Sequence, residues 1–219
     1  MRVSFIIPVY GNWHLTNQIL VDIRDHSSSV DEIVIVDDYG LDLETEYGLE
    51  WWVKNSGLNI VVVNPPENLG FLKASNLGES VATGDFIVQI SSDVRVEDDL
   101  AGLVRKILRD DPKTLIGGIV YEDTTGWNEF DGRVFPYAEG WLMGCTKEAW
   151  RVIGFDERYS PNDFEDVDSS TTALFLGYKL VSLNNPKIRH LGAKTIGYTD
   201  ARRELTERNR EKFRQKWLP

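Results

Sequence analysis

Short apolar runs alternate with longer amphipathic stretches through the first half of the chain. The runs cover residues 3–9, 32–36, 59–63 and 85–90, and they are apolar at nearly every position rather than at every second one. Such a run is typical of a strand covered on both faces, as in a parallel sheet wrapped by helices. The pattern therefore predicts an α/β fold with a mostly parallel sheet.

Three segments carry apolar or small residues at helical spacing. They predict helices over residues 15–23, 71–82 and 100–108. The Asp-Asp-Pro sequence at residues 110–112 is expected to end the third helix, because the residue before a proline disfavours helical backbone.

The second half of the chain is less regular. Residues 115–121 predict a strand, whereas residues 122–139 are rich in Gly, Asp, Asn and aromatic side chains and are expected to form a long loop. Loops of this length are usually functional or mobile.

Helix signals return further along the chain. A short helix is expected after the capping residue Thr146, and a second helix, capped by Asn162 or Asp163, is expected to run to Gly177. The last expected elements are a strand over residues 179–183 and a helix over residues 200–217.

The composition is that of one soluble domain. Of the 219 residues, 42% are hydrophobic and 27% charged, close to the globular average and without the loss of aromatics that marks disorder. A lone Cys145 excludes a disulfide scaffold. The apolar N-terminal run is too short for a signal peptide, and no run approaches the roughly 20 apolar residues of a spanning helix, so we expect a cytoplasmic protein.

The charge is unevenly distributed. The 24 Lys and Arg against 35 Asp and Glu give a net charge of -11, which excludes a general nucleic-acid binder, because such proteins carry surplus positive charge. The basic residues gather in residues 200–217. This segment is therefore expected to contact an anionic acceptor or the surface of a membrane.

Acidic residues directly follow two predicted strands. Asp37 and Asp38 come after the second strand, and Ser92 and Asp93 come after the fourth. Ligands of open α/β sheets bind at the carboxyl ends of strands, and a carboxylate beside hydroxyls suits a hard cation such as Mg2+ or Mn2+. A turn in which these residues supply only backbone geometry is the alternative.

Residues 162–168 (Asn-Asp-Phe-Glu-Asp-Val-Asp) place four carboxylates at the start of a predicted helix. A helix N-terminus stabilises negative charge, but four carboxylates exceed what capping requires. Crowded carboxylates raise one another's pKa, and a pKa near neutrality suits a general base. His190 follows one further helix and strand, which could return it to the same edge of the sheet.

Several familiar motifs are missing. The sequence has neither a G-x-x-x-x-G-K-[ST] phosphate loop nor a G-x-G-x-x-G opening a helix. Neither G-x-S-x-G nor H-E-x-x-H occurs, which removes the usual hydrolase and zinc-protease patterns.

The order of the motifs resembles that of glycosyltransferase family 2, whose members have the GT-A fold. The resemblance covers roughly residues 3–195. Its last two segments are similar to a signature most typical of rhamnosyltransferase-like members. The matching segments are residues 3–10, 35–38, 67–71, 76–78, 82–85, 154–158 and 165–168.

This resemblance implies a single GT-A domain over residues 1–219, with a Rossmann-like, mostly parallel central sheet flanked by helices. Residues 1–97 would form the nucleotide-sugar-binding half and residues 98–195 the acceptor-binding half. Residues 196–219 would form a basic C-terminal helix.

The resemblance also implies donor-site residues. Asp93 would contact a divalent cation, Mn2+ or Mg2+, together with His190. The residues expected to bind the nucleotide sugar are Pro8, Val9, Tyr10, Asp37, Asn68, Gly70, Lys73, Ser92 and Asp93.

Acceptor-side roles follow in the same way. Asp166 matches the base that deprotonates the acceptor, and Glu165 would assist it. Trp141 and Asp168 would bind the acceptor. Aromatic residues between 122 and 139 are expected to shape this site, because aromatic faces pack well against sugar rings, with core packing as the competing explanation.

Enzymes of this family transfer a sugar from a nucleoside diphosphate to a hydroxyl, with inversion and in a single displacement. The resemblance implies a hexosyltransferase that uses a UDP-sugar or dTDP-rhamnose and a glycan or lipid-linked acceptor. The Q-x-x-R-W motif of processive members is missing, which implies single transfers.

One departure keeps other functions open. Ser91 stands where the family usually has Asp or Asn, which leaves the need for a metal open. A catalytically weakened nucleotide-sugar-binding module is therefore the alternative. A nucleotidyltransferase is a third option, but the Gly-rich loop with a basic residue is missing after Val9.

Overall fold

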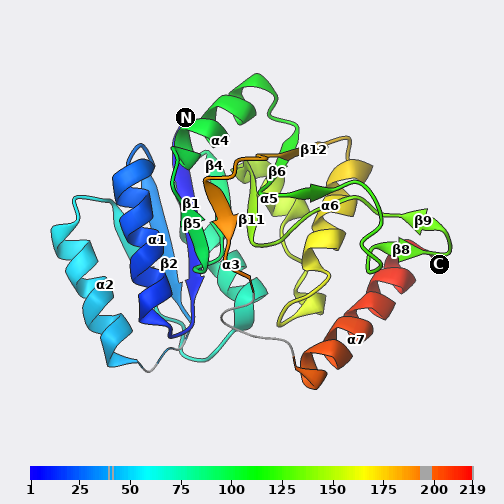
Figure 1. Cartoon of the computed structure of the whole chain (residues 1–219), viewed down its shortest axis with the longest axis horizontal. Coiled ribbons are helices and arrows are strands. Elements are labelled where there is room, and N and C mark those ends of the chain that lie inside the picture. Colours follow the sequence, from blue (N-terminus) through cyan, green and yellow to red (C-terminus); the bar gives the residue numbers. More distant parts are fainter. Residues whose placement is uncertain (39, 41, 193–198, 219) are drawn as a thin grey trace.

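The computed structural model describes residues 1–38, 40, 42–192 and 199–218. A seven-stranded sheet with the order β12-β6-β11-β4-β1-β2-β3 forms its centre (Figure 1). Neighbouring strands are parallel except at β11, which is antiparallel to β4 and β6. The expected mostly parallel α/β sheet is confirmed. Its strands are β1 (Val3–Val9), β2 (Glu32–Asp37), β3 (Ile60–Val63), β4 (Phe86–Ile90), β6 (Thr114–Gly117), β11 (Leu142–Thr146) and β12 (Lys179–Ser182).

Helices cover both faces of the sheet, which explains why its central strands are apolar at almost every position. Phe5 and Ile7 of β1 belong to the core on one face, whereas Ile6 between them belongs to the core on the other. The first core is covered by α1 (Trp13–His26), α2 (Leu43–Asn55) and α4 (Leu100–Asp110). The second is covered by α3 (Gly70–Val81), α5 (Lys147–Ile153), α6 (Glu165–Phe175) and α7 (Asp200–Trp217).

The predicted helices α1, α3 and α4 and the four N-terminal strands are confirmed, whereas α2 and β11 were not predicted. In α2 the buried Leu49 and Trp52 follow helical spacing, but the exposed Tyr47 and Trp51 obscure the amphipathic pattern. In β11 a glycine, Gly144, interrupts the apolar run.

The strand expected over residues 115–121 is divided into β6 and β7 (Val120–Tyr121). Gly118 lies at the break, where an added Cβ would lie 2.0 Å from the ring of Trp141. The segment expected to be a long loop contains short strands instead. These are β8 (Glu129–Phe130), β9 (Arg133–Val134) and β10 (Tyr137–Ala138), of which β10 pairs with β7 and β8 with β9.

The caps of the later helices are partly as expected. Thr146 caps α5 by accepting a hydrogen bond from the Ala149 N–H. The prediction that Asn162 or Asp163 caps α6 is wrong: the N-cap residue is Phe164, in the left-handed region at φ 74°, and α6 ends at Phe175. Asp163 lies one position before the cap, and its carboxylate accepts hydrogen bonds from Arg202 and Thr206 of α7.

Two short strands outside the main sheet pair as an antiparallel ribbon. They are β5 (Val94–Val96) and β13 (Ile188–His190), with His190 opposite Val94. A 3-10 turn at Glu157–Tyr159 precedes α6, and α7 lies beside α6 on the side of the molecule away from α2 (Figure 1). Within the described residues, no helix is long and apolar enough to cross a bilayer.

Candidate functional site

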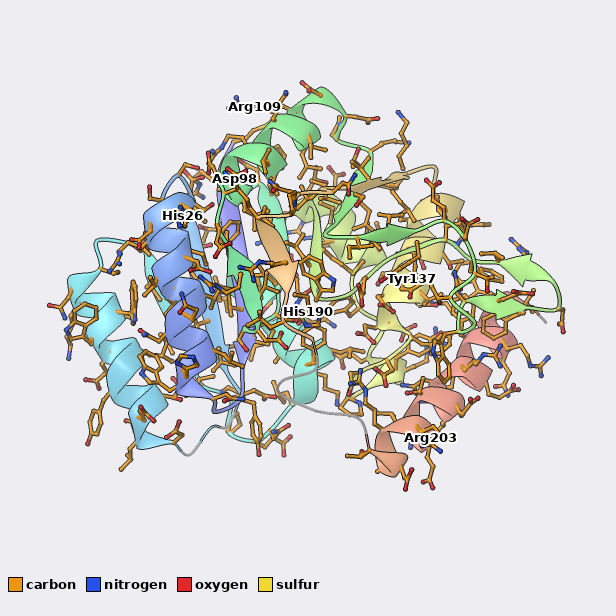
Figure 2. The ribbon with its side chains drawn as sticks, viewed as in Figure 1. His26, Asp98, Arg109, Tyr137, His190 and Arg203 are labelled. Carbon is orange, nitrogen blue, oxygen red and sulfur yellow. The ribbon has the colours of Figure 1, made fainter. Side chains whose placement is uncertain are left out.

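A cleft of about 980 Å³ opens at the carboxyl ends of β1 and β4. Its opposite wall is built by the start of α6 and the first turns of α7. Figure 2 shows His190 and Tyr137 towards the middle of the molecule and Arg203 on α7, and all three line this cleft. Of the residues expected at the site, those in its lining are Pro8, Val9, Tyr10, Asn68, Gly70, Ser92, Asp93, Trp141, Glu165, Asp166 and His190.

The two acidic residues after β2 have different roles. Asp38 lines the cleft and accepts hydrogen bonds from the backbone N–H groups of Leu69 and Gly70, at 2.7 and 2.8 Å. It thereby fixes the start of α3 against the end of β2. Asp37, the residue expected to bind the base, is buried outside the lining, and the Asn64 amide donates to it at 3.3 Å.

Burial raises the pKa of Asp37. Lys73, also expected at the nucleotide-sugar site, is exposed on α3 outside the lining. The structure therefore brings Asp38 to the cleft, rather than Asp37 or Lys73.

Asp93 and His190 meet at the edge of the cleft. Nε2 of His190 lies 3.1 Å from Oδ1 of the buried Asp93. The ring of His190 stacks on Trp141, with centroids 5.6 Å apart and planes 12° from parallel. The indole of Trp141 is fixed in turn by a hydrogen bond from its Nε1 to Glu139 Oε2, at 2.9 Å. The expected return of His190 to this edge of the sheet is confirmed.

The pair fits a divalent cation as a partial set of ligands. A carboxylate and an imidazole are both suitable donors for Mn2+. Among the residues that the structure describes, no group of three or more His, Cys, Asp or Glu is placed to hold a metal. Phosphate oxygens and water would have to complete the coordination, as is usual for cations that bridge to substrate phosphates. The hydroxyl side chains of Ser91 and Ser92 line the same edge.

Glu165 and Asp166 face the cleft from the start of α6. Asp166 accepts hydrogen bonds from the backbone N–H of Val167, at 2.8 Å, and of Gly140, at 3.1 Å. Burial raises the pKa of Asp166 to about 7, and the charges of Glu139 and Asp163 act in the same direction. This carboxylate can therefore take up a proton near neutral pH.

Glu165 is more deeply enclosed, with 6% of its surface exposed. Burial, and next the charge of Asp166, raise the pKa of Glu165 well above its usual value. Its Oε2 is buried and has no hydrogen-bond partner in the described part of the chain. Both carboxylate residues pack closely against the backbone at residue 140, and this requires a glycine there. A Cβ added to Gly140 would lie 3.2 Å from Cβ of Asp166 and 3.3 Å from Oε1 of Glu165.

Asp168, expected to bind an acceptor, has a structural role instead. It is 2% exposed and lies outside the lining of the cleft. Its carboxylate accepts hydrogen bonds from Lys216 Nζ and Trp217 Nε1, both at 2.7 Å, and from Tyr159 OH at 3.2 Å. Asp168 therefore ties the end of α7 to α6. It lies on a different side of α6 from Asp166, which lines the cleft.

The aromatic residues expected to shape the acceptor site divide into two groups. Trp127, which is 46% exposed, and Tyr137 line the cleft. Burial raises the pKa of Tyr137 to about 12, so its hydroxyl stays protonated. Phe130 and Phe135 instead pack against Phe213 of α7 in the core. Core packing therefore accounts for Phe130 and Phe135, whereas a role of Trp127 and Tyr137 in an acceptor site stays a prediction.

Sequence patterns did not identify several residues of the cleft. The sequence points to Asp37 and Asp38 together but assigns nucleotide binding to Asp37, and Glu139 lies at the end of a segment expected to be a loop. The residues of the wall at the start of α7 could not be picked out from the predicted basic helix. They reach the cleft only because the folded chain brings the start of α7 beside it. These are Thr199, Asp200, Arg202, Arg203 and Thr206.

Comparison with protein families gives one match over most of the chain. The family model described as Glycosyl transferase family 2 matches residues 4–175. No curated protein was found to match the chain in sequence.

Three solved structures are similar in fold. A mannosyltransferase from Pyrobaculum calidifontis, PcManGT, in complex with GDP-Man and Mn2+, has a TM-score of 0.63 and 23% identity over 83% of this chain and 54% of its own. GalNAc-T7 with UDP, GalNAc and Mn2+ has a TM-score of 0.77 and 14% identity over 99% of this chain and 48% of its own. S. aureus TarS 1-349 in complex with UDP-GlcNAc has a TM-score of 0.62 and 18% identity over 91% of this chain and 62% of its own.

These likenesses confirm the α/β fold with its mostly parallel sheet. The chain spans between about half and three fifths of the length of these structures.

Proposed function

The chain belongs to glycosyl transferase family 2, with the GT-A fold expected of it, and we propose that it is an inverting glycosyltransferase. It would move a sugar from a nucleoside diphosphate to a hydroxyl group. The observation that carries this proposal is one cleft lined on one side by Asp93 and His190 and on the other by Asp166. The cleft thus offers a cation-binding pair and a base on opposite sides of the space where a sugar would lie.

The donor side must stabilise a departing diphosphate. Asp93 and His190 would hold a divalent cation, which when bound neutralises negative charge on the diphosphate. Pro8, Val9 and Tyr10 line the cleft at the end of β1, where they are available to the nucleotide base. The N–H groups of Leu69 and Gly70 are already bonded to Asp38, so this segment contributes shape rather than free donors.

The acceptor side must remove a proton. A hydroxyl placed within hydrogen-bond distance of Asp166 would pass its proton to this carboxylate as the hydroxyl oxygen attacks the anomeric carbon. The bond to the diphosphate breaks in the same step, which inverts the anomeric carbon. The hydrogen bonds from Val167 and Gly140 keep the carboxylate in place, and the charges of Glu139 and Asp163 favour its uptake of a proton.

The donor class is the finer part of the proposal. A UDP-sugar or dTDP-rhamnose is the donor expected from the resemblance to rhamnosyltransferase-like members. The similar structures contain GDP-Man, UDP or UDP-GlcNAc. Sugars carried by UDP, dTDP and GDP therefore all belong in the test. The acceptor is proposed to be a glycan or a lipid-linked sugar, packed on Trp127 and Trp141 at the cleft.

The two halves, residues 1–97 and 98–195, remain the proposed donor and acceptor parts, in a protein that acts in the cytoplasm. Contact of residues 196–219 with the inner face of a membrane also remains a prediction. Arg208 of α7 is exposed and available for it, and Arg214 is exposed but paired with Glu211. Lys212 and Lys216 are not available for it, because they bond to the body of the protein.

The first experiment is a thermal-shift screen of UDP-glucose, UDP-GlcNAc, GDP-mannose and dTDP-rhamnose, each with and without Mn2+. Stabilisation by one donor, enhanced by Mn2+, followed by release of its nucleoside diphosphate in the presence of a glycan, would support the proposal. No stabilisation by any of the four would contradict it.

Ser91, which lines the cation edge of the cleft, favours a second candidate, a nucleotide-sugar-binding module of weakened activity. The two candidates differ in turnover. Binding without nucleotide release in any pairing of donor and acceptor would favour the module.

A further inference from the structure

The turn that leads into the carboxylate pair, residues 159–164, is held from outside by one buried amide. Asn209 of α7 has no exposed surface. Its Nδ2 lies within hydrogen-bond distance of three carbonyl oxygens of the turn, those of Tyr159 at 2.7 Å, Asn162 at 2.9 Å and Asp163 at 3.0 Å. The other end of the amide is fixed as well, because Lys212 donates to Oδ1 of Asn209 at 3.0 Å.

The turn needs such support because of its backbone conformation. Asp163 and Phe164 are consecutive residues at positive φ, 71° and 74°, and neither is a glycine. A left-handed backbone conformation is unfavourable for residues other than glycine, and it persists only where contacts with the rest of the protein hold it. Phe164 is also the N-cap of α6, so Glu165 and Asp166 follow it directly and any rotation of the turn would displace both carboxylates.

Two further contacts from α7 act on the same turn. The carboxylate of Asp163 accepts hydrogen bonds from Arg202 Nη2 at 2.9 Å and from Thr206 Oγ1 at 2.7 Å. The ring of Phe213 packs on Phe164, with centroids 5.8 Å apart. Asn209 lies between these contacts along α7 and donates to the backbone of the turn, which also accepts a hydrogen bond from the Leu72 N–H at the Pro161 carbonyl.

We propose that Asn209 is a positioning residue for Glu165 and Asp166, acting through the backbone of residues 159–164. The expected effect of Asn209 on the rate of sugar transfer rests on the proposed function. Its expected effect on the position of the two carboxylates does not. The family model matches residues 4–175, so α7 and this role lie outside what the family match assigns.

The local consequence can be measured without any substrate. Three backbone N–H groups depend on the position of the Glu165 and Asp166 carboxylates. Those of Gly140 and Val167 donate to Asp166, and that of Asp168 donates to the Phe164 carbonyl. In Asn209→Asp, which keeps the shape of the side chain but replaces its donors by an acceptor, hydrogen exchange at these amides should accelerate by about tenfold or more. If Asn209→Asp does not fold, Asn209→Ala removes the donors without adding a charge.

The matched control is Arg210→Ala, which removes the contacts of α7 with the Glu129 carbonyl and the Phe130 ring but keeps every contact of α7 with the turn. The control should lower Tm without accelerating exchange at the three reporter amides relative to amides elsewhere on α6. Equal acceleration in both variants at the same loss of Tm would overturn the proposal, because the effect would then reflect the stability of α7 in general.

The kinetic consequence is a loss of kcat at an unchanged KM for the sugar nucleotide that the wild-type chain turns over. A displacement of about 1 Å at a catalytic group can lower the rate by about 100-fold, so we expect a loss of kcat of at least about tenfold. A loss of kcat no larger than in Arg210→Ala would contradict the kinetic role. If the wild-type chain transfers no sugar, the proposed function fails, and the exchange experiment still decides the structural role of Asn209.

Discussion

The imidazole Nε2 of His190 lies 3.1 Å from Oδ1 of Asp93, although 97 positions separate the two residues. The pairing of β13 with β5 places His190 opposite Val94, and the Leu191 N–H donates to the Asp93 carbonyl at 2.9 Å. The relationship is therefore set by the backbone. Either side chain can be replaced while the ribbon that carries it remains paired.

This pair predicts a dependence of nucleotide binding on metal. Mn2+ should raise the affinity of the wild-type chain for UDP by roughly 5- to 150-fold, the usual range for coupling between two ligands. Asp93→Ala should remove this coupling, and His190→Ala should weaken it. Isothermal calorimetry of UDP with and without Mn2+ measures it, with the exposed His26→Ala as the matched control. Equal affinities in all cases would mean that the site binds UDP without metal.

Asp166→Asn tests the proposed base. The variant keeps the size of the side chain but cannot take up the proton, so transfer should fall by roughly 100- to 10,000-fold, the usual contribution of general base catalysis. The Kd for UDP should change by no more than a few fold, because Asp93 and the end of β1 are intact. Exposed Asp123→Asn is the control, expected to behave as wild type. Preserved turnover in Asp166→Asn would remove this residue from the mechanism.

The pKa of about 7 at Asp166 predicts how the rate depends on pH. The base must be ionised to accept a proton, so kcat/KM should fall as the pH is lowered through about 7. Profiles of kcat/KM between pH 5 and pH 9 test this. A rate that is flat down to pH 5 would show that the group is already ionised there.

The same pKa predicts how stability depends on pH. Because burial raises the pKa in the folded chain, folded Asp166 holds its proton over a range where the unfolded chain has lost it. The stabilisation by the protonated form is lost as the pH rises through about 7. Asp166→Asn should therefore gain Tm relative to wild type between pH 5 and pH 8. A difference in Tm that does not change with pH would contradict the assignment.

Asp168 predicts a loss of stability rather than a loss of acceptor binding. Asp168→Ala leaves Lys216 and Trp217 without their buried partner, which should lower the free energy of unfolding by about 3 kcal/mol. Urea denaturation measures the change. Exposed Glu211→Ala, which removes another acidic contact of α7, should leave Tm almost unchanged. A raised KM for acceptor in a fully stable Asp168→Ala would restore the acceptor role.

Much of the fold follows from local pattern. The runs in β1 to β4 are apolar at both odd and even positions, because alternate residues of each strand point into the cores on opposite faces of the sheet. Phe5 and Ile6 show this for β1. The elements that were missed lack that signal. In α2, Tyr47 and Trp51 are exposed, and β11 gains its place between β4 and β6 from its partners rather than from its own five residues.

The candidate site was predictable in part for a similar reason. Parallel strands bring their carboxyl ends to one edge, so Asp93 could be assigned to that edge from its position after β4. The direction of individual side chains could not be read in this way. Asp37 and Asp38 are neighbours in the sequence, yet only Asp38 lines the cleft, because successive residues of an extended chain point to opposite sides.

By itself, the sequence determined the mostly parallel sheet, the edge at which the cleft opens and the acidic segment that carries the proposed base, because these follow from spacing along the chain. Only the tertiary structure decided which carboxylates reach the cleft. Asp166 faces it, whereas Asp168, two residues further along the same helix, is satisfied by Lys216 and Trp217. The physical reason is that a buried charge is placed by its partners, and here those partners lie 48 and 49 positions away.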